Sequence, residues 1–227
     1  MTKWLAAALW SGILVLGFVS PVGAAGAARE VSFVTADGGT VYADLYGNGG
    51  RGVVLAHGAA FDKESWSALA GRLQSLGFQV LAIDFRGYGK SRGGGKAGGL
   101  EEDVLAAVRY LHGRGDKSVS VVGGSMGGGA SAEAATRAGQ GEIDRLILLS
   151  AVPIAHPEGI KAASTLFIAS RGEGLAGDVQ AQYGRAPQPK KLVLLDGSAH
   201  AQNIFATAQG ERLTQVITDF LAAPPAE

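Results

Sequence analysis

Apolar residues gather in six short runs along the chain, without the polar–apolar alternation of a half-exposed strand. Each run spans four residues and is largely aliphatic. Such a run is typical of a strand covered on both faces, as in a parallel sheet. The pattern therefore predicts strands at Val53–Ala56, Val80–Ile83, Val119–Val122, Leu146–Leu149, Leu166–Ala169 and Leu192–Leu195.

Between most of these runs, apolar residues recur at the three- and four-residue spacing of one helical face. One face runs from Trp66 to Leu76, with Gly77 placed as a C-terminal cap, and others span residues 100–111 and 213–221. Alternating strands and helices with right-handed crossovers predict an α/β fold with three α/β/α layers and a doubly wound, mostly parallel sheet.

The segment before the first run differs because its polarity alternates. Val31, Phe33 and Thr35 alternate with their neighbours, and a turn at Asp37-Gly38-Gly39 leads into a second alternating stretch that ends near residue 45. This pattern predicts an N-terminal antiparallel hairpin. Because we find no linker or internal repeat after it, we expect residues 25–227 to form a single domain.

The first 24 residues have the pattern of a signal peptide. Lys3 precedes an apolar stretch, and Pro21 ends it. Val22-Gly23-Ala24 supplies the small residues of a cleavage site, and Ala25-Gly26-Ala27 offers a second one. We therefore expect an exported protein, periplasmic or secreted, without membrane attachment after cleavage. The alternative is an uncleaved membrane anchor, although the apolar stretch of 16 residues is shorter than the roughly 20 that a span needs.

Composition narrows the classes of partner and chemistry. The chain has 20 basic and 20 acidic residues and no basic block, which argues against nucleic acid or an anionic membrane as its main partner. It contains no cysteine, so disulfides, thiolate metal sites and cysteine nucleophiles are excluded. The high content of hydrophobic residues, 47%, excludes disorder through charge repulsion.

A G-x-S-x-G motif at Gly123–Gly127 lies between a predicted buried strand and a helix of small residues. In this setting the motif forms a strained turn, whose neighbouring residues must be small and whose serine hydroxyl stands clear of the sheet. The helix that follows begins beside the hydroxyl, and its dipole favours developing negative charge. Ser125 is therefore the candidate nucleophile.

A serine nucleophile needs a base, and the chain offers four histidines, His57, His112, His156 and His200. His200 follows the last apolar run, at the strand end where a doubly wound sheet collects its site, so it is the predicted base. We expect His57 to order its own loop by hydrogen bonding, His112 to be a solvated surface residue, and His156 to lie in a loop.

The base in turn needs a carboxylate to hold its tautomer. The loop after Leu166–Ala169 offers Glu173, four residues past the strand, and Asp178, which alternatively caps a helix. We favour Glu173 and leave Asp178 open, while Asp196 is too near His200 in sequence to be a good candidate.

Two backbone N–H groups are expected to bind the oxyanion. One is that of Met126, directly after the nucleophile. The second comes from the loop after the first central strand, and Ala59 is the residue we select.

Together these residues resemble the α/β-hydrolase superfamily across residues 30–222. The matching pieces are His57-Gly58 with Trp66 after it, residues 84–91, Gly123–Gly127, and His200 after the last strand. The order Ser125, Glu173, His200 also follows the nucleophile–acid–histidine order of the family. The resemblance implies that Asp84 and Arg86 tie a loop structurally. The chain departs from the family in having Glu where Asp is commoner. Val152–Ala163 is also too short for the helical cap of many relatives, so the site should be shallow and open.

The resemblance and the residues together predict an exported serine hydrolase, similar to capless esterases and dienelactone hydrolases, that cleaves small carboxylic esters through an acyl-enzyme. This chemistry needs no metal or organic cofactor. A thioesterase, a lactone hydrolase and a peptidase are alternatives on the same machinery, and a noncatalytic secreted binding protein is the alternative from another class. The physiological substrate and the oligomeric state are not predicted.

Overall fold

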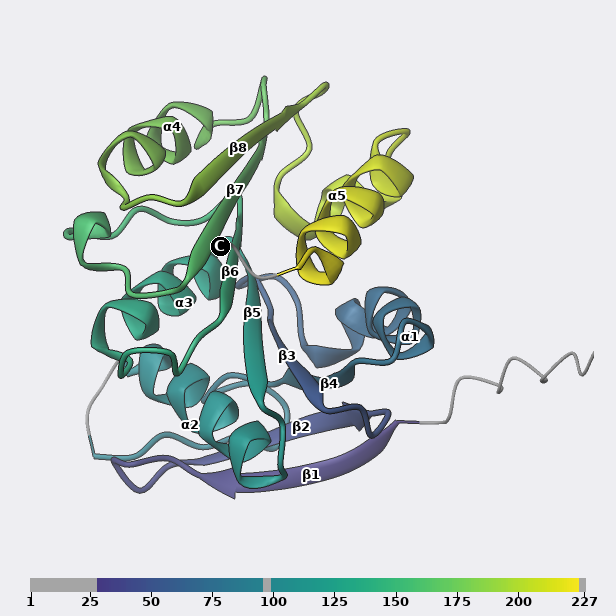
Figure 1. Cartoon of the computed structure of the whole chain (residues 1–227), viewed down its shortest axis with the longest axis vertical. Coiled ribbons are helices and arrows are strands. Elements are labelled where there is room, and N and C mark those ends of the chain that lie inside the picture. The colour runs from purple at the N-terminus through teal and green to yellow at the C-terminus, as the bar shows by residue number, and fades with distance from the viewer. Residues whose placement is uncertain (1–27, 96–98, 225–227) are drawn as a thin grey trace, which may run out of the picture.

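A computed structural model describes residues 28–95 and 99–224, so the predicted signal peptide lies outside the described residues. At its centre is one eight-stranded sheet of order β1-β2-β4-β3-β5-β6-β7-β8 (Figure 1). β2 pairs antiparallel with β1 and β4, and every other neighbouring pair is parallel. The strands are β1(Arg29–Val34), β2(Thr40–Tyr46), β3(Arg51–Ala56), β4(Gln79–Ile83), β5(Ser118–Gly124), β6(Arg145–Leu149), β7(Ser164–Ser170) and β8(Lys190–Leu195). This order confirms the predicted sheet and its N-terminal hairpin.

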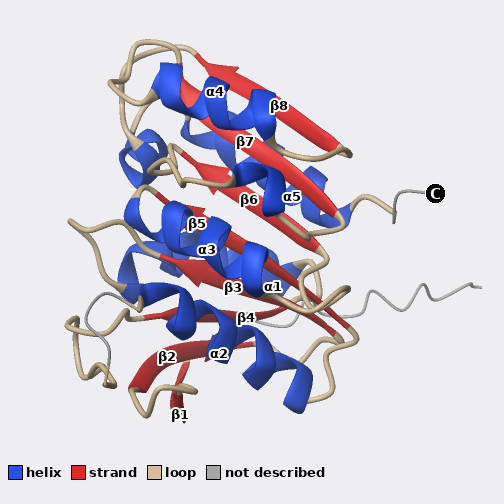
Figure 2. Cartoon of the chain, turned by 90° about the vertical axis from the view of Figure 1, so that its left-hand side faces the viewer, coloured by secondary structure: helices blue, strands red, loops and turns tan. Residues whose placement is uncertain are grey.

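Helices cover both faces of the sheet, which confirms the three-layer α/β/α fold (Figures 1 and 2). One face carries α2(Leu100–Gly113), α3(Met126–Arg137) and α4(Ala176–Arg185), and the other carries α1(Ser67–Ser75) and α5(Gly210–Ala222). Short 3-10 turns lie at Lys63–Trp66, Pro157–Gly159 and Ala201–Ala206. Within the described ranges, no helix is long and apolar enough to cross a membrane.

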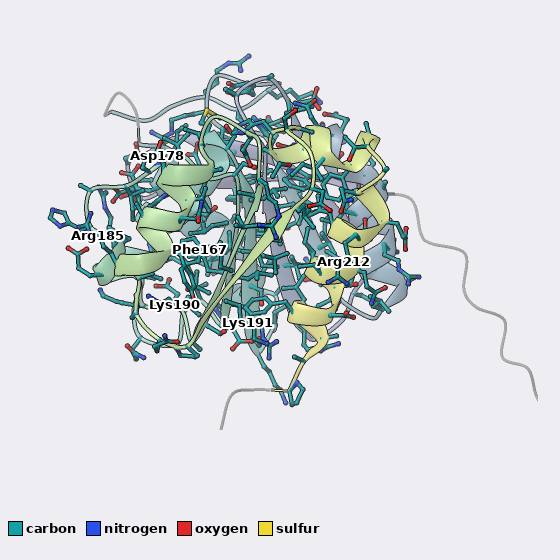
Figure 3. All side chains as sticks on the ribbon, turned by 90° about the horizontal axis from the view of Figure 1, so that it is seen from above. Phe167, Asp178, Arg185, Lys190, Lys191 and Arg212 are labelled. Carbon is teal, nitrogen blue, oxygen red and sulfur yellow. The ribbon has the colours of Figure 1, made fainter. Side chains whose placement is uncertain are left out.

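The last strand corrects one sequence-based expectation. Leu192, Val193 and Leu194 are only half-buried, whereas β4 and β6 are buried throughout. The reason is topological, since β8 is an edge strand that pairs only with β7 among the described residues. Figure 3 looks onto this edge, with β8 passing between α4 and α5.

Asp84 and Arg86 form the structural ties that the family resemblance implies. Asp84 accepts a hydrogen bond from the Lys63 N–H at 2.9 Å. The Arg86 guanidinium donates to Asp103 and to Asp37, both at 2.7 Å, and so joins the loop after β4 to α2 and to the β1–β2 turn. The glycine-rich loop that follows β4 is thereby held at its first residues.

Asp116, between α2 and β5, is buried with no hydrogen-bond partner for either carboxylate oxygen in the described part of the chain. Burial raises the pKa of this carboxyl to about 6, above its ordinary value of 3.8. The folded state therefore favours the protonated acid, and stability is lost as pH rises from about 4 to about 6.

Asp116→Asn mimics the protonated acid and does not titrate. We therefore expect its stability relative to the wild type to increase as pH rises through this interval. The relative gain should be on the order of 1–3 kcal/mol by pH 7, measured by urea unfolding at pH 4 and pH 7. Asp196→Asn is the control, because the Asp196 side chain is 83% exposed and should show no such gain. A stability difference between Asp116→Asn and the wild type that is the same at both pH values would contradict this account.

Candidate active site

Ser125 occupies a strained turn between β5 and α3. Its φ of 52° and ψ of −114° lie in a region that residues with a side chain rarely adopt. A Cβ on Gly123 would lie 2.4 Å from the Gly127 carbonyl oxygen, and a Cβ on Gly127 would lie 2.4 Å from the Ala56 carbonyl oxygen. The close approach of β5, α3 and β3 therefore requires glycine at both positions.

The structure brings His200 to the predicted nucleophile. His200 follows β8 and precedes the 3-10 turn at Ala201–Ala206, and its Nε2 lies 2.8 Å from Ser125 Oγ. The imidazole is 37% exposed, and Ser125 is half-buried, so the pair is open to solvent on one side. This distance is suited to proton transfer from the hydroxyl to the ring.

The structure also places Glu173 against His200 and leaves Asp178 away from it. Glu173 Oε2 lies 2.5 Å from His200 Nδ1, and the glutamate side chain is 1% exposed. Asp178 is exposed in the first turn of α4, where it lies inside the helix rather than at the N-cap. Asp196 lies on the surface beside Arg171. Glu173 is thus the carboxylate whose geometry suits the role of orienting the base.

Ser150 is a residue of the site that sequence reasoning missed. It is fully buried at the end of β6 with φ of 47°, and its Oγ donates to Glu173 Oε1 at 2.6 Å. Ser150 Oγ also accepts a hydrogen bond from the Ala201 N–H at 3.0 Å. The Ser170 N–H donates a second hydrogen bond to Glu173 Oε1, at 2.8 Å. Two donors therefore hold the inner carboxylate oxygen, and the outer one faces His200. The sequence around Ser150 contains no motif that would predict its contact with Glu173.

The two predicted oxyanion donors belong to segments that adjoin Ser125. The Met126 N–H begins α3, and the Ala59 N–H follows β3 in the loop His57–Phe61; neither donates a hydrogen bond among the described residues. A Cβ on Gly58 would lie 3.3 Å from Ser125 Cβ, so this loop packs directly against the strained turn at Ser125. Free N–H groups at this position can bind a developing negative charge.

His57 orders the loop after β3 by hydrogen bonding, as its position suggested. Its Nδ1–H donates to the Gly58 carbonyl at 2.9 Å, and its Nε2 accepts the Phe85 N–H at 3.2 Å. Burial lowers the pKa of this imidazole, which keeps it in the neutral form that both hydrogen bonds require. The Tyr88 hydroxyl adds a third tie by donating to the Ala59 carbonyl at 2.9 Å.

The other two histidines lie elsewhere, and one expectation was wrong. His112 is not a freely solvated side chain, since it is half-buried and its ring nitrogens contact the Asp116 and Glu142 carbonyls at 3.0 and 2.9 Å. It joins the end of α2 to the loop before β6. His156 is exposed beside Glu158. Within the described residues, no group of three or more His, Asp or Glu side chains is arranged to hold a metal ion.

The connection between β6 and β7, where many relatives insert a helical cap, is short. The connection after Ser150 contains one 3-10 turn, Pro157–Gly159, and no α-helix before β7. Val152, which follows the strand end, is 41% exposed. This connection therefore forms no helical cap, as its length predicted.

Comparisons with known proteins agree with the fold. A family model described as "Alpha/beta hydrolase family" matches residues 53–226. The chain is 33% identical over 138 residues to a non-heme haloperoxidase of Rhodococcus erythropolis, covering 56% of this chain and 49% of the relative. It is 24% identical to the uncharacterized protein YfhR of Escherichia coli K12, over 74% of this chain and 69% of that protein.

Two solved structures share the fold. An esterase of Pyrococcus furiosus superposes with a TM-score of 0.73 at 20% identity, covering 88% of this chain and 92% of the esterase. An enol-lactonase of Burkholderia xenovorans superposes with a TM-score of 0.68 at 17% identity, covering 85% of this chain and all of that enzyme.

Proposed function

This chain belongs to the alpha/beta hydrolase family, and on that premise we propose that it is an exported serine hydrolase that cleaves small carboxylic esters. One observation carries the proposal: Ser125 Oγ, the His200 ring and the Glu173 carboxylate lie in hydrogen-bond contact in that order, at 2.8 and 2.5 Å. A buried carboxylate, an imidazole and a serine in this arrangement activate a hydroxyl that is otherwise a poor nucleophile.

In the proposed mechanism, Ser125 Oγ attacks the ester carbonyl carbon while His200 Nε2 takes the hydroxyl proton. Glu173 stabilises the resulting imidazolium, and the N–H groups of Met126 and Ala59 bind the oxyanion of the tetrahedral intermediate. The intermediate then expels the alcohol, which receives its proton from His200. A water molecule, deprotonated by His200, attacks the acyl-enzyme and releases the acid, restoring Ser125.

The openness of the site supports small or surface-presented substrates. The connection between β6 and β7 contains no α-helix, so it supplies no helical cap to enclose an extended acyl chain. A thioester, a lactone or an amide would meet the same nucleophile and the same oxyanion donors. A thioesterase, a lactone hydrolase and a peptidase are therefore alternatives that would use the same catalytic residues. A noncatalytic binding protein is the alternative from another class.

A substrate panel tests the proposal directly. We expect the purified protein to hydrolyse p-nitrophenyl acetate and butyrate with higher kcat/KM than the dodecanoate, and to act on these esters faster than on the matched thioester, lactone and anilide. A fluorophosphonate probe should label Ser125, as located by peptide mass spectrometry. A folded protein that neither turns over the panel nor takes the label would be a binding protein instead.

We also propose that residues 1–24 are removed during export. Sequencing of the N-terminus of the protein released from the producing cell should begin at or just after Ala25, and an intact Met1 in the membrane fraction would instead support an uncleaved anchor.

A further inference from the structure

Gln202 lies two residues after His200, and its side chain joins other segments to the loop that carries the base. Oε1 accepts the Gly58 N–H at 2.8 Å, and Nε2 donates to Ser65 Oγ at 2.6 Å. The residue is 5% exposed, so a polar side chain is buried with both ends of its amide engaged. The hydrogen bonds among Ser125, His200 and Glu173 involve none of these atoms.

The strained turn at Ser125 also packs closely against the Gln202 side chain. A Cβ on Gly124 would lie 2.8 Å from Gln202 Oε1, and a Cβ on Gly58 would lie 3.2 Å from that oxygen. Gln202 therefore fills the space between the residue before the nucleophile and the loop after β3. Its Oε1 is the acceptor that satisfies the Gly58 N–H at this crowded position.

Gly58 is the residue directly before the proposed oxyanion donor. The Ala59 N–H shares one planar peptide with the Gly58 carbonyl, which accepts hydrogen bonds from His57 Nδ1 at 2.9 Å and from the Phe61 N–H at 3.0 Å. The peptide on the other side of Gly58 is held by Gln202 through its N–H. A glycine otherwise has wide backbone freedom, so holding both of its peptides sets the direction of the Ala59 N–H.

We propose that Gln202 is a positioning residue that aims the Ala59 N–H at the oxyanion and ties this donor to the loop bearing His200. The inference rests on the proposed function, because it concerns the transition state of the same acyl transfer. Gln202 acts on a donor that is used fully only when the oxyanion forms. Its loss should therefore affect the transition state more than the bound ester.

Gln202→Met tests this, because it removes both hydrogen bonds at similar side-chain volume. We expect kcat for p-nitrophenyl acetate to fall about 10- to 100-fold, with KM within about threefold of the wild type. The pH dependence of kcat/KM should keep its midpoint, since the contacts of His200 with Ser125 and Glu173 are left in place.

An inhibitor gives a readout that a loss of folded protein would not produce. A trifluoromethyl ketone reacts with Ser125 Oγ at its carbonyl carbon, the serine proton passes to His200, and the carbonyl oxygen becomes an alkoxide in the oxyanion position. Its inhibition constant should rise by about the same factor as kcat/KM falls.

Two other variants complete the test. Ser65→Ala removes the acceptor of Gln202 Nε2, together with the hydrogen bond that Ser65 Oγ donates to the Asp62 carbonyl, and leaves the contact of Gln202 Oε1 with the Gly58 N–H in place. We therefore expect kcat to fall by less than in Gln202→Met, again without a change in KM. Gln180→Met makes the same replacement at an exposed position of α4 and should leave kcat unchanged.

Circular dichroism tests whether each variant is folded. If Gln202→Met is unfolded, the kcat and KM of Ser65→Ala decide the question by the same criteria. Wild-type kcat in the folded variant, a loss confined to KM, or a moved pH midpoint would overturn the inference. A wild-type protein without ester turnover or Ser125 labelling would refute the proposed function instead.

Discussion

Replacing Ser125 with alanine should lower kcat/KM for p-nitrophenyl acetate by about 10⁴- to 10⁶-fold, which leaves only the residual rate that the oxyanion donors and substrate binding support. The expected effect is this large because the attacking atom itself is removed, and His200 then has no hydroxyl to deprotonate. Alanine fits the turn sterically, since it is smaller than serine and has the same Cβ. The variant should therefore remain folded, with a melting temperature near that of the wild type.

The control is Ser198→Ala, which removes an exposed hydroxyl two residues before His200. We expect its kcat/KM to stay within about twofold of the wild type, and fluorophosphonate labelling to be lost only in Ser125→Ala. Normal ester turnover by a folded Ser125→Ala protein would remove the nucleophile from the proposal and, with it, the acyl-enzyme mechanism.

Replacing Glu173 with glutamine should lower kcat by about 10³- to 10⁴-fold with little change in KM. The amide has nearly the same shape but no charge to stabilise the imidazolium. Ser150 Oγ and the Ser170 N–H both donate to Glu173 Oε1, so the glutamine oxygen is expected at that position and its NH2 group toward His200 Nδ1. That arrangement favours the tautomer protonated at Nε2, which cannot accept the Ser125 proton.

Asp178→Asn is the matched control for this variant, because it makes the same change of charge in the other carboxylate of the β7–β8 connection. Asp178 is exposed on α4, so we expect kcat within about twofold of the wild type. A loss of kcat in Asp178→Asn, with normal rates in Glu173→Gln, would exchange the two assignments and would require the α4 region to move in solution.

The contact between Ser125 and His200 could be predicted because the signals for both residues are local. Gly123 and Gly127 flank Ser125 at the spacing that a strained turn demands, and this requirement can be recognised without knowing which elements the glycines contact. His200 follows an apolar run whose C-terminal end must lie at the same edge of a parallel sheet as that of β5. The pattern of apolar runs likewise predicted the strands and the three layers.

The choice between Glu173 and Asp178 was different in kind, since both lie after β7 within a few residues. Only the path of the chain shows that Glu173 turns inward onto Ser150 and Ser170, while α4 carries Asp178 to the surface. His112 was misjudged for a related reason: the carbonyls that it contacts belong in part to the loop before β6, 30 residues away in sequence.

The amino-acid sequence by itself determined the sheet, the strained turn and the end of the sheet at which the site forms, because these follow from hydrophobic periodicity and from steric limits within a few residues. Tertiary structure alone decided which polar side chains support the site. Ser150 reaches Glu173 across 23 residues of sequence, and Gln202 reaches Gly58 across 144. A hydrogen bond depends on the direction and separation of two atoms to within a fraction of an ångström, and for distant residues these are set only when the strands and helices pack together.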